Sequence, residues 1–178
     1  MLGIILDERL SLKYHVKYLI SKINKSLFFL SCVRNTLNAE AKKLLYFAHI
    51  HSHLIYCLPL FTLLYKTEIN TLCRIQRKSI RMVYNVSQRC SSAELFHDLG
   101  ILPLNILLEK EIMKIMQGIH SYRKPREIVD FFNITHVSHH YNFRETLAFQ
   151  IPLIKSARLS SLPIYYVPFV FNQFPENF

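Results

Sequence analysis

The sequence predicts a mainly α-helical protein, an irregular bundle of about five helices followed by a proline-rich, partly extended C-terminal tail. Two observations indicate this class. Up to about residue 122, apolar side chains recur three and four positions apart, which is the spacing of one face of a helix. Five of the seven prolines come after that point. Because proline removes a backbone donor and fixes φ, we expect no long helix there.

The first two helices are marked by spacing and by caps. Apolar positions from Leu12 to Val33 predict a long first helix. Asn38 is a suitable N-cap for a second helix that runs toward Leu54 and Ile55, with Glu40 in its first turn. Pro59 should kink or end this second helix.

Three more helices are expected before the tail. The apolar positions of Thr67 to Val83 lie on one side when projected at about 100° per residue. Ser91 to Glu94 has the pattern of a capping box, which predicts a short helix that ends before Gly100. Pro103 suits the first turn of a fifth helix that extends to Ile119. In the tail, Thr146 to Ile154 could form a short extended segment.

The bulk composition favours a globular protein with a polyanionic partner. Hydrophobic residues make up 51% of the chain, which excludes global disorder. With 22 Lys and Arg against 12 Asp and Glu, the net charge of +10 favours nucleic acid, although a basic protein without such a partner remains an alternative.

The cysteines and the apolar runs indicate an intracellular protein, cytoplasmic or nuclear. Four cysteines without Cys-x-x-Cys spacing predict reduced, mostly buried thiols rather than a disulfide framework or a zinc knuckle. The start is too short and too soon charged for a signal peptide. The run from Leu54 to Tyr65 is too short to span a bilayer, so we expect a soluble protein without membrane contact.

The sequence lacks the residue patterns of the common catalytic sites. Its only aspartates are Asp7, Asp98 and Asp130, and they do not form the carboxylate cluster that a two-metal nucleotidyl transferase requires. Three scattered glycines exclude a glycine-rich phosphate loop. We therefore expect no catalytic residue, no metal and no cofactor in this chain.

Two groups of histidines resemble metal ligands only in part. His49, His53 and Cys57 would align at i, i+4 and i+8 on a helix, but no further ligand completes the set. Packing is the favoured interpretation. The stretch from His136 to His140, with His139 between them, is better interpreted as a polar loop.

A basic stripe on the third helix is the strongest binding signal. Arg74, Arg77, Lys78 and Arg81 are three, four and seven positions apart, so they share one side, opposite the apolar face. Gln76 projects near the apolar side. Four cations without interleaved acids repel one another by tenths of a kcal/mol per pair, and bound phosphates would neutralise them. A solvated helix face is the equal alternative.

Five short blocks follow one another in a recognisable order. They are Leu2–Asp7 with Leu10, Leu12 and His15; Leu45-Tyr46 with His51–Leu54 and Tyr56-Cys57; Leu72–Arg81; Leu95-Phe96 with Leu99–Leu104; and Phe171–Pro175. Together they resemble the C-terminal part of reverse transcriptases from jockey-like non-LTR retrotransposons. The third block matches that family's leucine, glutamine, basic pair, isoleucine and arginine, whereas the last has Phe171 and Phe174 where tryptophan and leucine are usual.

The resemblance implies a non-catalytic fragment of an RNA-directed DNA polymerase. In that family the catalytic aspartates, including the Tyr-x-Asp-Asp motif, lie upstream of the Leu-Gly strand. Residues 1–10 would then be a remnant of the palm and primer-grip strand, 11–122 a helical thumb-like domain and 123–178 a proline-rich C-terminal segment. An upstream palm domain or another protein would be a partner.

By resemblance, thumb helices touch the backbone of the primer-template duplex, which implies an RNA–DNA or DNA duplex as the ligand. The basic stripe is the candidate contact, assisted by Lys22 and Lys25 of the first helix. Backbone contacts confer affinity and register without sequence readout.

Two other functions compete with this one. The chain could be an inert, transposon-derived helical fragment, or a helical protein-interaction module that docks through aromatic residues of its tail. Those residues are Tyr165, Tyr166, Phe169 and Phe171. Charge reversal on the third helix would separate nucleic-acid binding from both.

Overall fold

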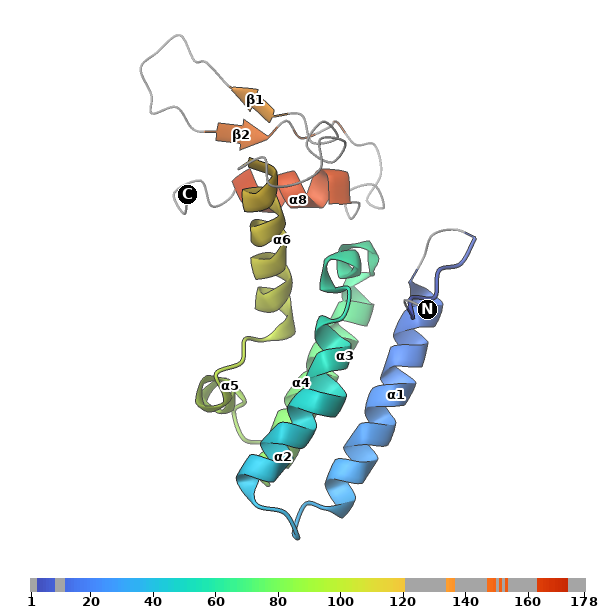
Figure 1. Cartoon of the computed structure of the whole chain (residues 1–178), viewed down its shortest axis with the longest axis vertical. Coiled ribbons are helices and arrows are strands. Elements are labelled where there is room, and N and C mark those ends of the chain that lie inside the picture. The colour runs from blue at the N-terminus through green and yellow to red at the C-terminus, as the bar shows by residue number, and fades with distance from the viewer. Residues whose placement is uncertain are drawn as a thin grey trace. The chain divides into compact units, whose positions relative to one another are not determined.

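Helices make up most of the chain that the computed structural model describes, which confirms the predicted mainly α-helical class (Figure 1). The described residues are 3–8, 12–120, 134–136, 147–149, 151, 153 and 163–172. In chain order the elements are α1 (Lys13–Cys32), α2 (Ala39–Tyr46), the π-helical turn η1 (Phe47–His51), α3 (Ser52–Ile55), the 3₁₀ helix η2 (Leu58–Leu63), α4 (Lys66–Val83), α5 (Ala93–Leu99), α6 (Leu104–His120), β1 (Ile134–His136), β2 (Leu147–Phe149) and α8 (Pro163–Asn172).

The chain divides into two units, Met1–Leu107 and Leu108–Phe178, and the division falls within α6. In the first unit, α1 lies beside the α2–α3 segment, and α4 contacts both of them (Figure 1). Residues 3–8 have no regular secondary structure. The domain boundary that we predicted near residue 122 lies among residues 121–133, outside the described part of the chain.

Helix α1 confirms the first predicted helix, and it buries one side only. Its buried side chains are three or four residues apart, so they form one stripe along the helix. They are His15, Val16, Leu19, Ile23, Leu27 and Leu30. The side chains on the other side of α1 do not pack in the core, and most of them are exposed to solvent.

The second predicted helix begins as expected. The Asn38 Oδ1 accepts a hydrogen bond from the Ala41 N–H at 2.9 Å, and Glu40 lies in the first turn. The helical segment ends at Ile55, before Pro59, as predicted. Cys57 then takes a left-handed conformation with φ of 55° and leads into η2.

The π-helical turn η1 interrupts the second predicted helix. Buried side chains in this segment are four residues apart, at Lys42, Tyr46, Ile50 and Leu54. In a regular α-helix each such step drifts by about 40°, so the last of them would lie about 120° from the first. The wider π turn accommodates about one extra residue, which removes about 100° of that drift. The interruption therefore keeps these four side chains on one buried face.

Helix α4 confirms the third predicted helix to within one residue at its start. At its N-terminus the Glu68 carboxylate accepts a hydrogen bond from the Tyr65 N–H at 3.1 Å. Its buried face is formed by Leu72, Gln76, Ser79, Ile80 and Val83. The burial of Gln76 on this side agrees with its predicted position.

An asparagine in the left-handed region ends α4. Asn85 has φ of 58°, and its N–H bonds back to the Met82 carbonyl at 3.2 Å. The next N–H, from Val86, bonds to the Arg81 carbonyl at 3.0 Å, which completes a Schellman motif. The Arg34 Nε donates to the Asn85 side chain and so joins the turn after α1 to the end of α4.

Helix α5 ends as predicted but starts differently. Gly100 has φ of 63°, and the Ile101 N–H reaches the Phe96 carbonyl at 3.0 Å. The predicted capping box is wrong, because the N-cap is Ser92 and its side chain makes no capping bond. This start lies one residue later than expected, which puts Glu94 too early in the helix to complete the box.

The tail contains a helix where we expected only irregular or extended segments. β1 and β2 pair antiparallel, with Ile134 opposite Phe149, and β2 lies within the predicted extended stretch. Helix α8, however, spans two prolines. Pro163 occupies the first position, where its missing N–H has no partner to lose. Pro168 lies inside a very apolar segment, and the burial of Val167 and Val170 offsets the hydrogen bond that it removes.

Candidate nucleic-acid interface

The basic stripe lies on the exposed side of α4. At 100° per residue its four cations project within an arc of about 100°, opposite the buried face. Arg74, Arg77 and Lys78 are exposed, and Arg81 is half-buried. Within the described part of the chain, neither Arg74 nor Lys78 forms a hydrogen bond or an ion pair. Their charges are therefore available to an external anion.

Two arginines of the stripe already contact backbone carbonyls. The Arg77 Nε donates to the Cys73 carbonyl at 3.2 Å, within α4 itself. The Arg81 Nε donates to the Cys90 carbonyl at 3.0 Å and so holds the loop after α4 against the helix. Arg81 thus has a structural contact in addition to its predicted place in the stripe.

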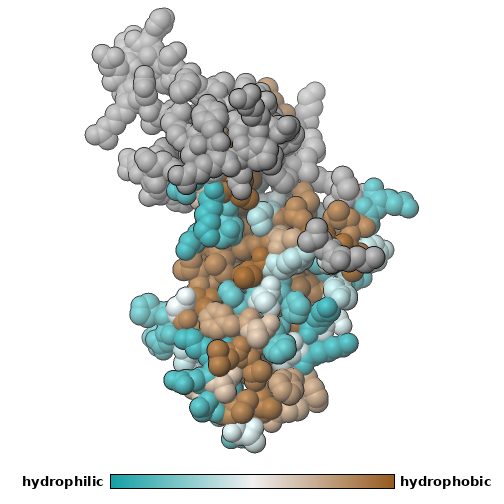
Figure 2. Space-filling view, in the orientation of Figure 1, coloured by the Kyte–Doolittle hydropathy of each residue, from teal (hydrophilic) through white to brown (hydrophobic). Residues whose placement is uncertain are grey.

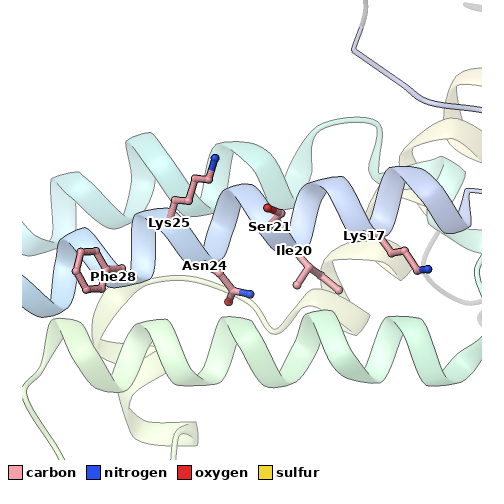
Figure 3. Close-up of a pocket in the computed structure, with 6 residues that line it drawn as sticks. All are labelled: Lys17, Ile20, Ser21, Asn24, Lys25 and Phe28. Carbon is pink, nitrogen blue, oxygen red and sulfur yellow. The ribbon is translucent and has the colours of Figure 1, made fainter.

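Lys22 and Lys25 lie on α1, on a different helix from the stripe. The Lys22 Nζ is 4.8 Å from the centroid of the Tyr18 ring, within reach of a cation–π interaction. Lys25 borders a shallow, open depression along α1 that is also lined by Phe28 (Figure 3). In that view Lys25 and Asn24 point toward opposite edges of the helix. The predicted lysines therefore lie among exposed aromatic side chains, which sequence reasoning had not singled out.

A cleft beside the stripe was also missed from the sequence. It has a volume of about 560 Å³, and its lining includes Lys66, Cys73, Arg77, Phe96 and Asn105. Burial raises the pKa of the Cys73 thiol, and the nearby Arg77 charge offsets part of this rise. No short motif marks the cleft, because its walls come from α4, α5 and the start of α6.

One histidine of the second helix, His51, packs against aromatic residues of the same helix, whereas His49 is exposed. The His51 ring lies 5.8 Å from that of Tyr46 and 5.3 Å from that of Phe47. Burial lowers the pKa of His53, and the Lys22 charge lowers it further. The predicted line of His49, His53 and Cys57 is broken, because η1 intervenes and the chain leaves the helix before Cys57.

The described part of the chain offers no arrangement of side chains that suits a metal ion. There, no group of three or more His, Cys, Asp or Glu side chains is placed to hold an ion. His139 and His140 lie outside the described residues, as does the side chain of His136. The four cysteines are free; Cys32 and Cys90 are exposed, which corrects the expectation of mostly buried thiols.

The tail aromatics contact one another. The rings of Tyr165 and Phe169 stack with centroids 5.9 Å apart. Tyr166 is half-buried, and burial together with the Glu109 charge raises its pKa. The side chain of Phe171 lies outside the described residues.

Comparison with known proteins gives no match. No family model matches the sequence, and neither a curated protein nor a solved structure is detectably similar to the chain. The resemblance to reverse transcriptases therefore stays a hypothesis that rests on the five sequence blocks. No helix among the described residues is long and apolar enough to cross a bilayer.

Proposed function

We propose that this chain binds the backbone of a nucleic-acid duplex through the exposed cations of α4. One observation carries the proposal: an 18-residue helix buries its apolar side and presents three exposed cations, with a fourth beside them, on the other. Backbone contacts of this kind give affinity without sequence readout.

Repulsion among the cations of α4 favours binding of an anion to this face over exposure of the face to solvent alone. Like charges three and four residues apart destabilise a helix by about 0.2 to 0.5 kcal/mol per pair. The acidic residue of α4, Glu68, lies in its first turn and bonds to Tyr65, away from the stripe. Phosphates along a duplex would remove this repulsion and gain charge-assisted hydrogen bonds.

The sequence blocks suggest the biological setting. We propose a non-catalytic, thumb-like part of an RNA-directed DNA polymerase of a non-LTR retrotransposon, with an RNA–DNA or DNA duplex as its ligand. The block with the closest match to that family, Leu72–Arg81, is also the segment that carries the stripe. An upstream palm domain would supply the chemistry.

The experiment compares two triple variants of equal charge. In one, Arg74, Arg77 and Lys78 become Gln; Arg81 is kept because of its bond to Cys90. In the matched control, Lys43, Lys110 and Lys114 become Gln. Binding of a labelled RNA–DNA duplex is followed by fluorescence anisotropy at several salt concentrations, together with the melting temperature.

The α4 variant should bind more weakly and lose about 3 units of log-log salt slope, since each contacted phosphate contributes about 0.9. Its melting temperature should stay close to that of the wild type, because only exposed side chains change. The control should keep most of the slope. An equal loss in both variants would reduce the effect to net charge, and unchanged binding in the α4 variant would remove α4 as the contact.

A further inference from the structure

The solvent side of α1 carries aromatic rings where a helix of a globular protein usually carries charges. Tyr14 is 58% exposed, Tyr18 43%, Phe28 72% and Phe29 51%. At 100° per residue these four rings project within an arc of about 100°, opposite the buried stripe of the same helix. Together with Lys17 and Lys25 they form what we call the aromatic–lysine face. On the face that Figure 2 shows, hydrophobic (brown) and hydrophilic (teal) residues lie next to one another.

The charge of this face has one sign. Helix α1 contains four lysines and no acidic residue, and the sequence has none between Glu8 and Glu40. A second protein surface would have to be strongly acidic to fit such a face, whereas a nucleic acid is anionic throughout. Charge complementarity therefore favours a polyanion.

The aromatic rings favour a single-stranded nucleic acid over a duplex. In a duplex the bases are already stacked on one another, so exposed rings gain little from it, whereas unpaired bases stack readily on aromatic side chains. From Tyr14 to Phe28 the helix rises about 21 Å, enough for a few extended nucleotides. The Lys22 ammonium already covers the Tyr18 ring, which leaves Phe28 as the most open platform.

A membrane surface fits less well. Interfacial helices separate an apolar side from a charged one, but here Ser21 and Lys25 project within the arc of the rings and line the same depression as Phe28 (Figure 3). The continuous apolar side of α1 is the one that is already buried.

We propose that the aromatic–lysine face of α1 binds single-stranded nucleic acid, with bases stacked on its rings and phosphates paired with its lysines. The proposal rests on the nucleic-acid binding proposed above, but it assigns a different helix and a different form of the ligand. A chain with both surfaces would hold a duplex and the unpaired strand that adjoins it.

The absence of tryptophan from the chain allows a direct test of stacking. Phe28→Trp introduces a single tryptophan into the face, which can be excited selectively over the tyrosines, and Leu44→Trp, at an equally exposed position on α2 (71%), is the matched control. Each protein is titrated with a short oligothymidylate, with a blunt duplex and with phosphatidylserine vesicles. Base stacking should quench the emission of Phe28→Trp with the single strand but not with the duplex, and should leave Leu44→Trp unchanged.

Affinity gives the second measurement. Phe28→Ala should weaken binding of the oligothymidylate by about 5- to 150-fold, while Leu44→Ala should not. The α4 triple variant separates the two proposals, because loss of duplex binding there tests α4 and leaves single-strand stacking at Phe28 to be measured on its own. Three results would overturn the α1 proposal. The first is that single strands do not quench the Phe28→Trp emission, and the second is that the duplex quenches it equally. The third is that the emission shifts to the blue as the protein concentration rises or as vesicles are added, without a response to single strands.

Discussion

At the scale of single residues, Gln76 determines how the start of α6 meets α4. The side chain is only 1% exposed, and both ends of its amide are used. Its Oε1 accepts a hydrogen bond from the Leu104 N–H at 2.9 Å, and its Nε2 donates to the Leu102 carbonyl at 3.3 Å. The spacing of α4 predicted that Gln76 lies on the buried side. Its partners could not be predicted, because they lie 26 and 28 positions further along the chain.

Gln76→Leu should destabilise the protein by about 1 to 3 kcal/mol, since a buried backbone N–H would lose its acceptor. The measurement is urea unfolding followed by circular dichroism. Gln88→Leu, at an exposed loop position, serves as the control and should change the free energy of unfolding by less than about 0.5 kcal/mol. Equal stability of the two variants would mean that water replaces the Gln76 contacts.

Tyr46 is a second buried residue with a measurable signature. Its ring is fully buried, and burial raises the pKa of its hydroxyl to about 12. Gln76 lies near enough to offset part of that rise, yet the hydroxyl has no hydrogen-bond partner with acceptable geometry among the described residues. Ionisation of Tyr46 is therefore more costly in the folded chain than in the unfolded one.

The sign of the resulting pH dependence follows. A pKa raised from 10 to about 12 on folding stabilises the protein below pH 10, and this contribution is lost as the pH rises toward 12. Over that interval the wild type should lose about 2 to 3 kcal/mol more than Tyr46→Phe. Urea unfolding at several alkaline pH values tests this, with Tyr65→Phe as an exposed control. Parallel pH profiles for wild type and Tyr46→Phe would contradict it.

At the scale of elements, the sequence predicted what a helix determines within itself. The span of α4 and its basic stripe follow from three-and-four spacing, which needs no knowledge of neighbours. The turn η1 could not be found in the same way, because a spacing of four fits an α-helix locally and fails only over three successive steps. For the same reason the Arg81 contact with Cys90 and the exposure of the rings on α1 required the structure.

Deletion of Ala48, an exposed residue within η1, tests the role of the π turn. A regular α-helix should replace η1 with its register kept, because the π turn accommodates about one residue more than a regular turn; Leu54 should therefore stay on the buried face. We expect little loss of stability in urea unfolding. Deletion of Asn24, an exposed residue of the regular helix α1, is the control: the buried side chains after it, Leu27 and Leu30, should rotate by about 100°, and we expect a loss of at least about 2 to 5 kcal/mol, the range for removing one buried leucine. A loss in the Ala48 deletion as large as that in the Asn24 deletion would refute this account.

At the scale of the whole chain, the helical class was predicted correctly and the tail only in part. Proline rules describe the local backbone, whereas α8 depends on the burial of Val167 and Val170, a tertiary effect that can override them. The short strand β2 was foreseen, but its partner β1 was not, because pairing joins segments that local patterns treat separately.

The acid-free stretch that contains α1 has a consequence for the free protein as well as for its ligands. The chain has a net charge of +10. Folding brings its cationic side chains closer together, and their mutual repulsion lowers the stability of the folded state. Salt screens charges that are more than about 10 Å apart at 0.1 M, so it should relieve this self-repulsion. The melting temperature of the free protein should therefore rise over the same range of KCl in which nucleic-acid affinity falls. Calorimetry at several KCl concentrations measures this; a melting temperature that falls with salt would contradict it. Bound nucleic acid would itself neutralise part of the protein's positive charge. The melting temperature of the complex should therefore no longer rise with salt.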